Sequence, residues 1–183
     1  MTIRVASTAD ARAVNEIYAY YYEHTLCSFN ESNKSDDERA HEIETLLERY
    51  PFLIAEGEDG ACLGFACGEP YRAQTGYRFT VELTIYLHPS APKGQGIGTA
   101  LYAELLRMLT EQGYYTAYGV LFSENEASIR LHRHFGFEKL ALLPHTAFKH
   151  GRWVDALIMQ KVLKSREDAA NEPISFSEYR KRL

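Results

Sequence analysis

Apolar residues follow two different periods along this chain. Stretches in which every second residue is apolar predict strands, and stretches in which apolar residues recur three and four positions apart predict helices. The predicted strands are residues 2–6, 52–56, 61–69, 77–87, 115–122, 138–148 and 153–162. The predicted helices are residues 9–23, a segment capped by Ser35 or Asp36, and residues 97–112 and 125–135.

Turn and cap residues support these limits. The run EDG at residues 58–60 predicts a hairpin turn, and KHG at residues 149–151 predicts the turn between the last two strands. Gly113 and Gly136 stand where helices end. Residues 25–34 are polar and unpatterned, so we expect a loop there.

The order of elements predicts the fold class. Paired strands come before a strand–turn–helix unit, which indicates an α/β or α+β domain of three layers around a mixed sheet. A chain of 183 residues fits one domain. We place that domain at residues 1–163. Residues 164–183 are charged and weakly patterned, and form either a tail or a helix that docks on the domain.

Composition narrows the class of protein. The formal net charge of −5 argues against non-specific binding to nucleic acid, because no basic excess can displace counterions. Cys27, Cys62 and Cys67 form neither a closed disulfide framework nor a zinc ribbon, so we expect reduced thiols and no metal site. The N-terminus lacks the apolar core of a signal peptide, and no run is long enough to cross a bilayer. We therefore expect a soluble cytoplasmic protein.

The strand predicted at residues 77–87 has one polar face. Thr80, Glu82, Thr84 and Tyr86 alternate with apolar residues, and the strand leads toward a crossover helix, so it should be central. A carboxylate on a central strand needs a partner or a water-filled cleft. In a cleft, partial burial would raise the pKa of Glu82 and suit it to accept a proton. The alternative is an ordinary half-exposed strand.

A glycine-rich turn follows this strand. In KGQGIG, residues 93–98, three alternate glycines precede a helix whose free N–H groups point into the turn, and this combination favours a diphosphate ligand. The alternative is a plain tight turn. The sequence lacks the Gly-Lys-Ser/Thr ending of phosphate-loop NTPases and the distal acidic residue of dinucleotide-binding folds.

These motifs carry a family resemblance. KGQGIG resembles the acetyl-CoA loop R/Q-x-x-G-x-G/A of the GNAT superfamily of N-acetyltransferases, with Lys93 in place of Arg or Gln. The run NEASIRLH at residues 125–132, followed by FGF at residues 135–137, resembles the second motif of that family. YRFTVE, SIRLH and FKHGRWVD are similar to the phosphinothricin acetyltransferase branch. The resemblance covers residues 3–163.

The resemblance implies a fold, a cofactor and a donor site. We expect the GNAT fold, with a mostly antiparallel mixed sheet and a parallel strand pair that splays apart to receive acetyl-CoA. The implied coenzyme-binding residues are Ile85, Tyr86, Leu87, Lys93, Gly94, Gln95, Gly96, Ile97, Gly98, Thr99, Asn125 and Ser128. A backbone N–H near Tyr86 or Leu87 would polarise the thioester carbonyl. Asn125 would bond the pantetheine amides or stabilise its own turn.

The resemblance also implies an N-acetyltransferase that acts on the primary amine of a small amino-acid-like molecule by direct transfer. Glu82 is the implied general base, or else only binds the ammonium. His132 would protonate the departing thiolate or act on the amine; the alternative is a helix histidine bonded to the backbone. Branch relatives are often dimers, so a homodimer is expected.

The acceptor pocket is inferred from residue types. The candidates are Phe29, Arg72, Tyr77 and Tyr86, with Arg72 or Arg78 supplying a cation for the carboxylate of an amino acid. Gln74 and His145 differ from the residues usual in herbicide-detoxifying members, so the acceptors considered are phosphinothricin, methionine sulfoximine, methionine sulfone and other small amines.

Two other functions stay open from the sequence. One is a protein N-terminal acetyltransferase, although the loop at residues 25–34 suggests a lid over a small ligand rather than a peptide groove. The other is a coenzyme-A-binding module without turnover.

Overall fold

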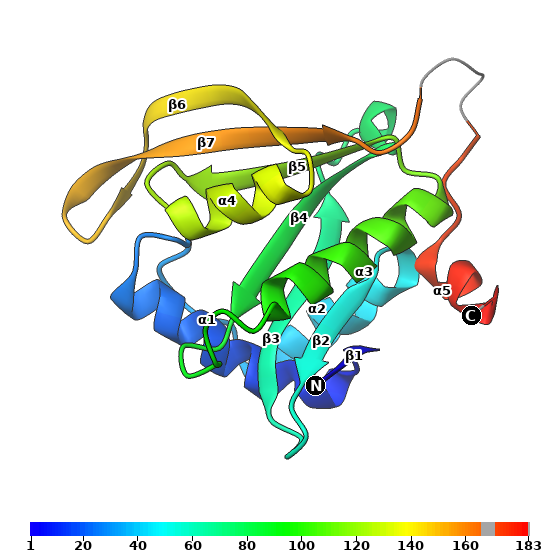
Figure 1. Ribbon diagram of the computed structural model, residues 1–183, viewed down its shortest axis with the longest axis horizontal. Helices are drawn as coiled ribbons and strands as arrows, with labels where there is room; N and C mark the ends of the chain where they lie inside the picture. The colour runs from blue at the N-terminus through cyan, green and yellow to red at the C-terminus, as the bar shows by residue number, and fades with distance from the viewer. Residues whose placement is uncertain (166–170, 183) are drawn as a thin grey trace.

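A computed structural model describes residues 1–165 and 171–182. Its centre is a seven-stranded sheet with the order β1-β2-β3-β4-β5-β7-β6 (Figure 1). The strands are β1 (Thr2–Val5), β2 (Phe52–Glu56), β3 (Cys62–Pro70), β4 (Thr80–Leu87), β5 (Thr116–Phe122), β6 (Glu138–Lys149) and β7 (Arg152–Val162). The helices are α1 (Ala11–His24), α2 (Asp36–Arg49), α3 (Ile97–Gln112), α4 (Glu126–His134) and α5 (Phe176–Tyr179). Within the described ranges, no helix combines the length and apolarity that a bilayer crossing needs.

Helices cover both faces of the sheet, which confirms the three-layer prediction (Figure 1). Side chains alternate along each strand, so one strand serves two cores. In β2, Leu53 and Ala55 pack with α3 in the larger core, whereas Phe52 and Ile54 pack with α1 and α2 in the smaller one. The sheet therefore separates an α3/α4 side from an α1/α2 side.

Strand β4 is the fourth of the seven, the central position predicted from the crossover helix that follows it. It pairs with β3 over seven residue pairs in antiparallel register. Its parallel ladder with β5 is much shorter and joins only Thr80, Val81 and Glu82 to residues 116–118. Both strands are described along their whole length, so the ladder ends at Glu82 and the strands separate beyond it. The splayed parallel pair expected from the family resemblance is confirmed.

Helix limits agree closely with the sequence pattern. Helix α3 begins and ends at the predicted residues, and Gly113 after it has the left-handed φ of 99° that a glycine cap allows. Ser35 caps α2 by accepting a hydrogen bond from Glu38 N–H, and Asn125 caps α4 in the same way at Ser128.

Two elements begin later than predicted. The prediction that a strand starts at residue 77 was wrong, because residues 75–77 form a 3-10 turn and β4 begins at Thr80. Aromatic residues there gave a strand-like pattern, but Tyr77 packs edge-on against Tyr71 in the turn instead of entering the sheet. Helix α1 begins at Ala11 after a 3-10 turn at residues 8–10, where Asp10 is ion-paired with Arg4.

The C-terminal segment returns to the main core. Phe176 and Tyr179 of α5 are buried among the apolar residues of the α3 side. The Gln112 side-chain amide, at the end of α3, donates to the Ile174 carbonyl at 2.9 Å. Part of the predicted tail, residues 166–170 and 183, lies outside the described residues.

Candidate active site

A cavity of about 250 Å³ occupies the gap between the separated ends of β4 and β5. Its walls come from β4, β5, α1, α3, α4 and the loop after α1. The lining residues are Tyr21, Cys27, Leu83, Thr84, Ile85, Tyr86, Leu87, Gly98, Val120, Leu121, Asn125, Ala127, Ser128, Leu131 and His132. Residues that the sequence motifs predicted and residues that they did not predict therefore line the same cavity.

The cavity reaches both faces of the sheet. Thr84 and Tyr86 point to the α1/α2 side, whereas Leu83 and Ile85 point to the α3/α4 side, because neighbouring strand residues face opposite ways. All four line the same cavity. The gap therefore connects the two sides of the sheet, and a molecule bound on the α3 side can present one end to a second molecule on the α1 side.

Backbone groups of β4 face this gap. His88 N–H donates to the Leu63 carbonyl at 2.9 Å, so His88 and Leu63 form a hydrogen-bonded pair of the β3–β4 ladder. Such pairs alternate with non-bonded pairs in an antiparallel ladder. Leu87 therefore directs its N–H and C=O away from β3, whereas Tyr86 bonds β3. The Tyr21 hydroxyl confirms this orientation by donating to the Leu87 carbonyl at 3.0 Å.

The glycine-rich turn has the backbone that a phosphate loop needs. Gly94 and Gly96 have φ values of 75° and 76°, and a Cβ on either would meet no atom within 4 Å. Gly96 has no side chain with which to cap α3, so the first amides of the helix receive no hydrogen bond from the cap residue's side chain. Lys93, Gln95 and Thr99 are exposed around this turn and lie outside the cavity wall.

Gly98 and Ile97 stand at the inner side of the turn. Ile97 is buried in the main core and anchors the helix start. Gly98 lines the cavity, and a Cβ there would lie 3.6 Å from Leu131 and 3.7 Å from Leu87, so the helix backbone runs close to both cavity walls.

Asn125 and Ser128 carry the start of α4 and line the cavity. The Asn125 side-chain oxygen accepts from Ser128 N–H at 3.1 Å, so the turn-stabilising role is present in the structure. The cap leaves the amide NH₂ of Asn125 able to donate elsewhere.

His132 is 1% exposed and has both ring nitrogens engaged. Nδ1–H donates to the Ser128 carbonyl at 2.8 Å, because a carbonyl can only accept. Nε2 then accepts from the Tyr102 hydroxyl at 2.7 Å. Burial lowers the pKa of His132, and the bond to Ser128 opposes this effect, so the ring is neutral at pH 7.

Glu82 lies on the same face of β4 as Thr84 and Tyr86, just before the strands separate. It does not line the cavity. Within the described residues, its carboxylate accepts no hydrogen bond. Burial raises the pKa of Glu82, the neighbouring Glu69 carboxylate raises it further, and Arg72 lowers it.

The predicted acceptor residues are only partly brought together. Tyr86 lines the cavity, whereas Phe29, Arg72 and Tyr77 do not. Arg72 instead acts on Glu82 from the segment between β3 and β4. Tyr77 lies in the same segment, where Tyr71 contacts the rings of both Tyr77 and Tyr118. Arg78 is turned away and pairs with Glu172.

Sequence reasoning missed part of this site. Tyr21 and Cys27 come from residues far from the motifs, and a contact across the sheet leaves no local signal. Thr84 was detectable, because it shares the alternating face with Glu82 and Tyr86. Leu131 was also detectable, since it stands inside the second family motif.

Comparison with known proteins identifies the family of this chain. The family model for the acetyltransferase (GNAT) domain matches residues 3–158. The chain belongs to the GNAT acetyltransferase family, and the prediction of an acetyl-CoA-dependent N-acetyltransferase is confirmed.

Individual relatives agree with the phosphinothricin branch. The chain is 38% identical over 162 residues to an L-methionine sulfoximine/L-methionine sulfone acetyltransferase of Salmonella typhimurium, covering 87% of this chain and 93% of the relative. A phosphinothricin acetyltransferase structure from Sinorhizobium meliloti, in complex with acetyl-CoA, is 39% identical with a TM-score of 0.86, covering 94% and 92%. A ribosomal-protein-alanine N-acetyltransferase structure from Brucella melitensis is 37% identical with a TM-score of 0.84, covering 88% and 99%.

Proposed function

We propose that this protein acetylates the primary amine of a small amino-acid-like acceptor of the phosphinothricin, methionine sulfoximine or methionine sulfone type. The observation that carries the proposal is the gap between β4 and β5, which joins the glycine-rich turn on one side of the sheet to the face of Glu82 and Tyr86 on the other. The acceptors named for similar proteins support the choice of substrate class.

The residues present fit acetyl-CoA. The amides of residues 94–99 would hold the diphosphate, since two glycines keep the turn open and no side chain caps the helix. The cavity between Ile85–Leu87 and Asn125–Ser128 would take the pantetheine arm. When bound, acetyl-CoA supplies the activated acetyl group as a thioester.

Leu87 N–H is the best candidate to polarise the thioester carbonyl. The ladder register directs this N–H into the gap, whereas the N–H of Tyr86 bonds β3. A donor already fixed in a strand stabilises developing negative charge without reorganising.

Glu82 would accept the proton that the acceptor ammonium must lose before it attacks. Burial and Glu69 raise its pKa toward neutrality, which makes its carboxylate a stronger base. The upward shift of the Glu82 pKa fixes the pH dependence. The rate falls as pH decreases through the raised pKa, because the protonated carboxyl cannot accept a proton from the ammonium.

His132 is the candidate proton donor to the departing thiolate, because it lines the cavity beside Ser128 on the donor side. Because the ring is neutral and Nε2 accepts from Tyr102, its Nδ1–H would stabilise the departing sulfur as a hydrogen-bond donor, and full transfer of that proton would require Nε2 to take up another. To donate from Nδ1 it must give up the bond to the Ser128 carbonyl.

Arg72 would bind the acceptor carboxylate. In the part of the chain that the structure describes, its guanidinium pairs with no carboxylate and stacks 4.7 Å over the Tyr71 ring. It acts electrostatically on Glu82, so it can place a carboxylate next to the base. Tyr77 and Phe29 would complete the pocket.

The proposal also covers the oligomeric state, the cellular location and the domain limits of the protein. We infer a homodimer, supported by the exposed apolar side chains on β6 and β7. We infer a reducing compartment, the cytoplasm, supported by the free thiols of Cys27, Cys62 and Cys67. We also infer that residues 1–163 form the catalytic domain and that residues 164–183 support it through α5.

The test is Glu82→Gln, assayed by release of free CoA with small amines across pH. We expect kcat to fall by about 100-fold or more, and the remaining rate to lose the wild-type dependence on pH. Glu58→Gln, in the exposed β2–β3 turn, is the matched control and should keep full rate. Full activity of Glu82→Gln at every pH would refute the base assignment.

A second candidate function is acetylation of a protein N-terminus, favoured by the likeness to the Brucella structure. A panel of alanine-initiated peptides, run beside the small amines, separates the two. Binding of CoA without turnover on either panel would instead indicate a coenzyme-binding module.

A further inference from the structure

Two glutamates face each other on neighbouring strands at the acceptor side of the sheet. In the β3–β4 ladder, Glu69 is the direct partner of Glu82. The hydrogen-bonded His88–Leu63 pair sets the alternation, so Glu69 and Glu82 also form a hydrogen-bonded pair. Directly opposed side chains in such a pair have Cβ atoms about 5.5 Å apart and lie on one face.

This pair works against the stability of the fold. Like charges directly opposite one another on a sheet are destabilising, and both side chains are half-buried, where screening by water is weaker. Among the described residues, neither carboxylate has a cation in ion-pairing contact. The unfavourable placement needs a reason other than folding.

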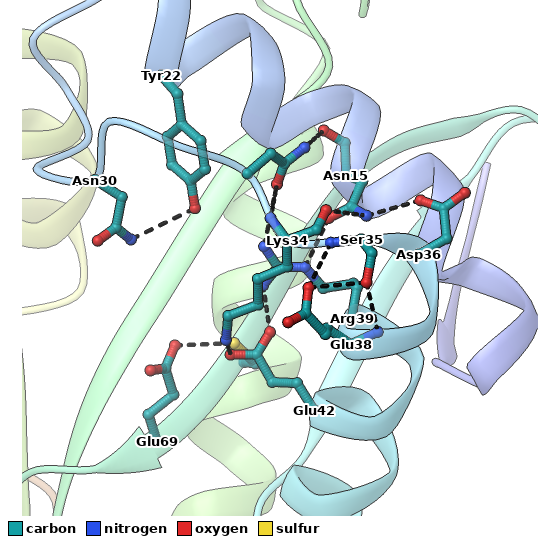
Figure 2. Close-up of polar contacts among 12 residues, drawn as sticks. Asn15, Tyr22, Asn30, Lys34, Ser35, Asp36, Glu38, Arg39, Glu42 and Glu69 are labelled. Carbon is teal, nitrogen blue, oxygen red and sulfur yellow. Dashed lines mark hydrogen bonds and ion pairs between the residues drawn. The ribbon is translucent and has the colours of Figure 1, made fainter.

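The surroundings leave the repulsion largely uncompensated. Within residues 1–165 and 171–182, the Glu69 side chain accepts one weak hydrogen bond, from the Cys67 thiol at 3.5 Å. Figure 2 draws this contact as a dashed line from Glu69 to the sulfur, with the Lys34 and Glu42 side chains in the same view. Glu42 pairs there with Lys34 at 2.6 Å and with Arg39, so these cations are already engaged.

The other groups around Glu82 are few. Tyr118 of β5 is its partner in the parallel register, and Arg72 approaches from the segment between β3 and β4. On the α2 side, Arg39 and Glu42 act on Cys67 with opposite signs. Glu69 and Arg72 therefore exert the main charge effects on Glu82, and they oppose each other.

We propose that Glu69 is a positioning residue of the acceptor site, whose negative charge opposite Glu82 sets the pH at which Glu82 takes up the proton of the acceptor ammonium. This inference rests on the proposed function, in which Glu82 is the base. With Glu69 charged, the proton on Glu82 is held more tightly, so the carboxylate is a stronger base. Arg72 counteracts this effect, and its own charge is neutralised once it binds the acceptor carboxylate.

The test is the pH dependence of kcat at saturating acceptor and acetyl-CoA. Glu69→Gln removes the charge and keeps the shape, so the acidic limb of the profile moves to lower pH and the plateau rate falls. Arg72→Gln moves the same limb to higher pH, the opposite direction. Glu58→Gln removes a charge that is 97% exposed in the β2–β3 turn, and leaves the profile unchanged.

A direct titration separates this inference from the proposed function. Carboxyl carbon NMR of glutamate-labelled protein reports Glu82 without turnover, with its signal identified by its loss in Glu82→Gln. We expect the Glu82 midpoint to decrease in Glu69→Gln and to increase in Arg72→Gln. An unchanged Glu82 midpoint in Glu69→Gln, in protein that stays folded, overturns the inference even if Glu82 proves to be the base. A shifted midpoint combined with full activity of Glu82→Gln overturns the proposed base instead.

A purely structural role for Glu69 makes a different prediction. If Glu69 stabilised the fold, Glu69→Gln would lower the thermal midpoint at pH 8 and leave the pH profile in place, which overturns the inference. Relief of like-charge repulsion should instead maintain or raise that midpoint. Above its usual pKa, the ionised Glu82 destabilises the fold, because its folded pKa is raised; the gain from Glu69→Gln should therefore vanish at acidic pH.

Discussion

At the scale of single residues, the position of His132 depends on a glycine in the neighbouring strand. The imidazole lies against Gly119 of β5, where a Cβ would come within 2.4 Å of Nε2. On its other side the ring is held by Tyr102 and by the Ser128 carbonyl. The ring is bonded at both nitrogens, so it cannot move aside without losing hydrogen bonds.

Gly119→Ala should therefore displace His132 and disturb the cavity wall. We expect a loss of about 1–3 kcal/mol in the free energy of unfolding, as for other overpacked interiors. The decrease in kcat should exceed any change in the KM for acetyl-CoA. Urea unfolding and steady-state kinetics measure the two effects.

The matched control is Gly98→Ala, in the first turn of α3. A methyl there would meet Leu131 at 3.6 Å, an ordinary contact, so stability should be maintained. Equal stability of the wild type and Gly119→Ala would show that His132 is not confined as described.

At the scale of elements, a buried lysine joins the last hairpin to the loop after α1. Lys149, at the end of β6, is 1% exposed. Its ammonium donates to the Ser28 carbonyl at 2.7 Å and to the Tyr21 carbonyl at 3.3 Å, and it lies 5.9 Å from the Tyr22 ring. A cation at the C-terminal turn of a helix is favourable. The loop that supplies Cys27 to the cavity is therefore held from the opposite end of the chain.

Lys149→Met keeps the side-chain length and removes the donor. We expect a loss of about 1–3 kcal/mol in stability, because buried carbonyls are left without a partner. The KM for the acceptor should rise more than the KM for acetyl-CoA, since the loop borders the acceptor side. Lys139→Met, at an exposed position of the same strand, should change neither. Equal effects on both KM values would contradict a role confined to this loop.

The limits of sequence reasoning show most clearly at the element scale. The helix pattern and flanking glycines predicted α3 to the residue, because propensity, period and cap all agree there. The alternation in β4 predicted its two faces. The same alternation cannot show which residue of another strand lies opposite, so the Glu69–Glu82 pair needed the register. Lys149 lies 121 residues from Ser28, and no local pattern reports such a contact.

At the scale of the whole molecule, one part of the site comes from short sequence motifs and the other part from residues that only the fold brings together. The glycine turn and the start of α4 are local motifs, and both were predicted to lie at the donor site. The proposed acceptor side is assembled from α1, β3, β4 and the segment between β3 and β4. Its predicted members Phe29, Arg72 and Tyr77 rested on residue type alone, and the structure brings only Tyr86 to the cavity wall.

The face of the molecule formed by β6 and β7 is apolar and uncovered. Phe148 and Trp153 are direct cross-strand partners with ring centroids 5.3 Å apart, and both are more than half exposed. Leu140 and Leu142 of β6 are also more than half exposed, and β6 is the edge strand of the sheet. An exposed apolar cluster beside a free strand edge is typical of a protein–protein interface.

We expect the homodimer to form through this β6/β7 surface, and substitutions on the surface test that expectation. Leu142→Glu combined with Trp153→Glu places charge in the proposed interface, where a desolvated carboxylate is costly, so the dimer should dissociate. Sedimentation velocity at micromolar concentration should show a dimer for the wild type and a monomer for the double variant, with unchanged far-UV circular dichroism. Tyr20→Glu, an exposed apolar position on α1, is the control and should remain dimeric. A monomeric wild type at high concentration would contradict the homodimer, and a dimeric double variant would place the interface elsewhere.

Strands β7 and β6 lie next to β5 in the sheet, and residues of β5 line the cavity. Dissociation should therefore also reduce kcat if the interface supports the site.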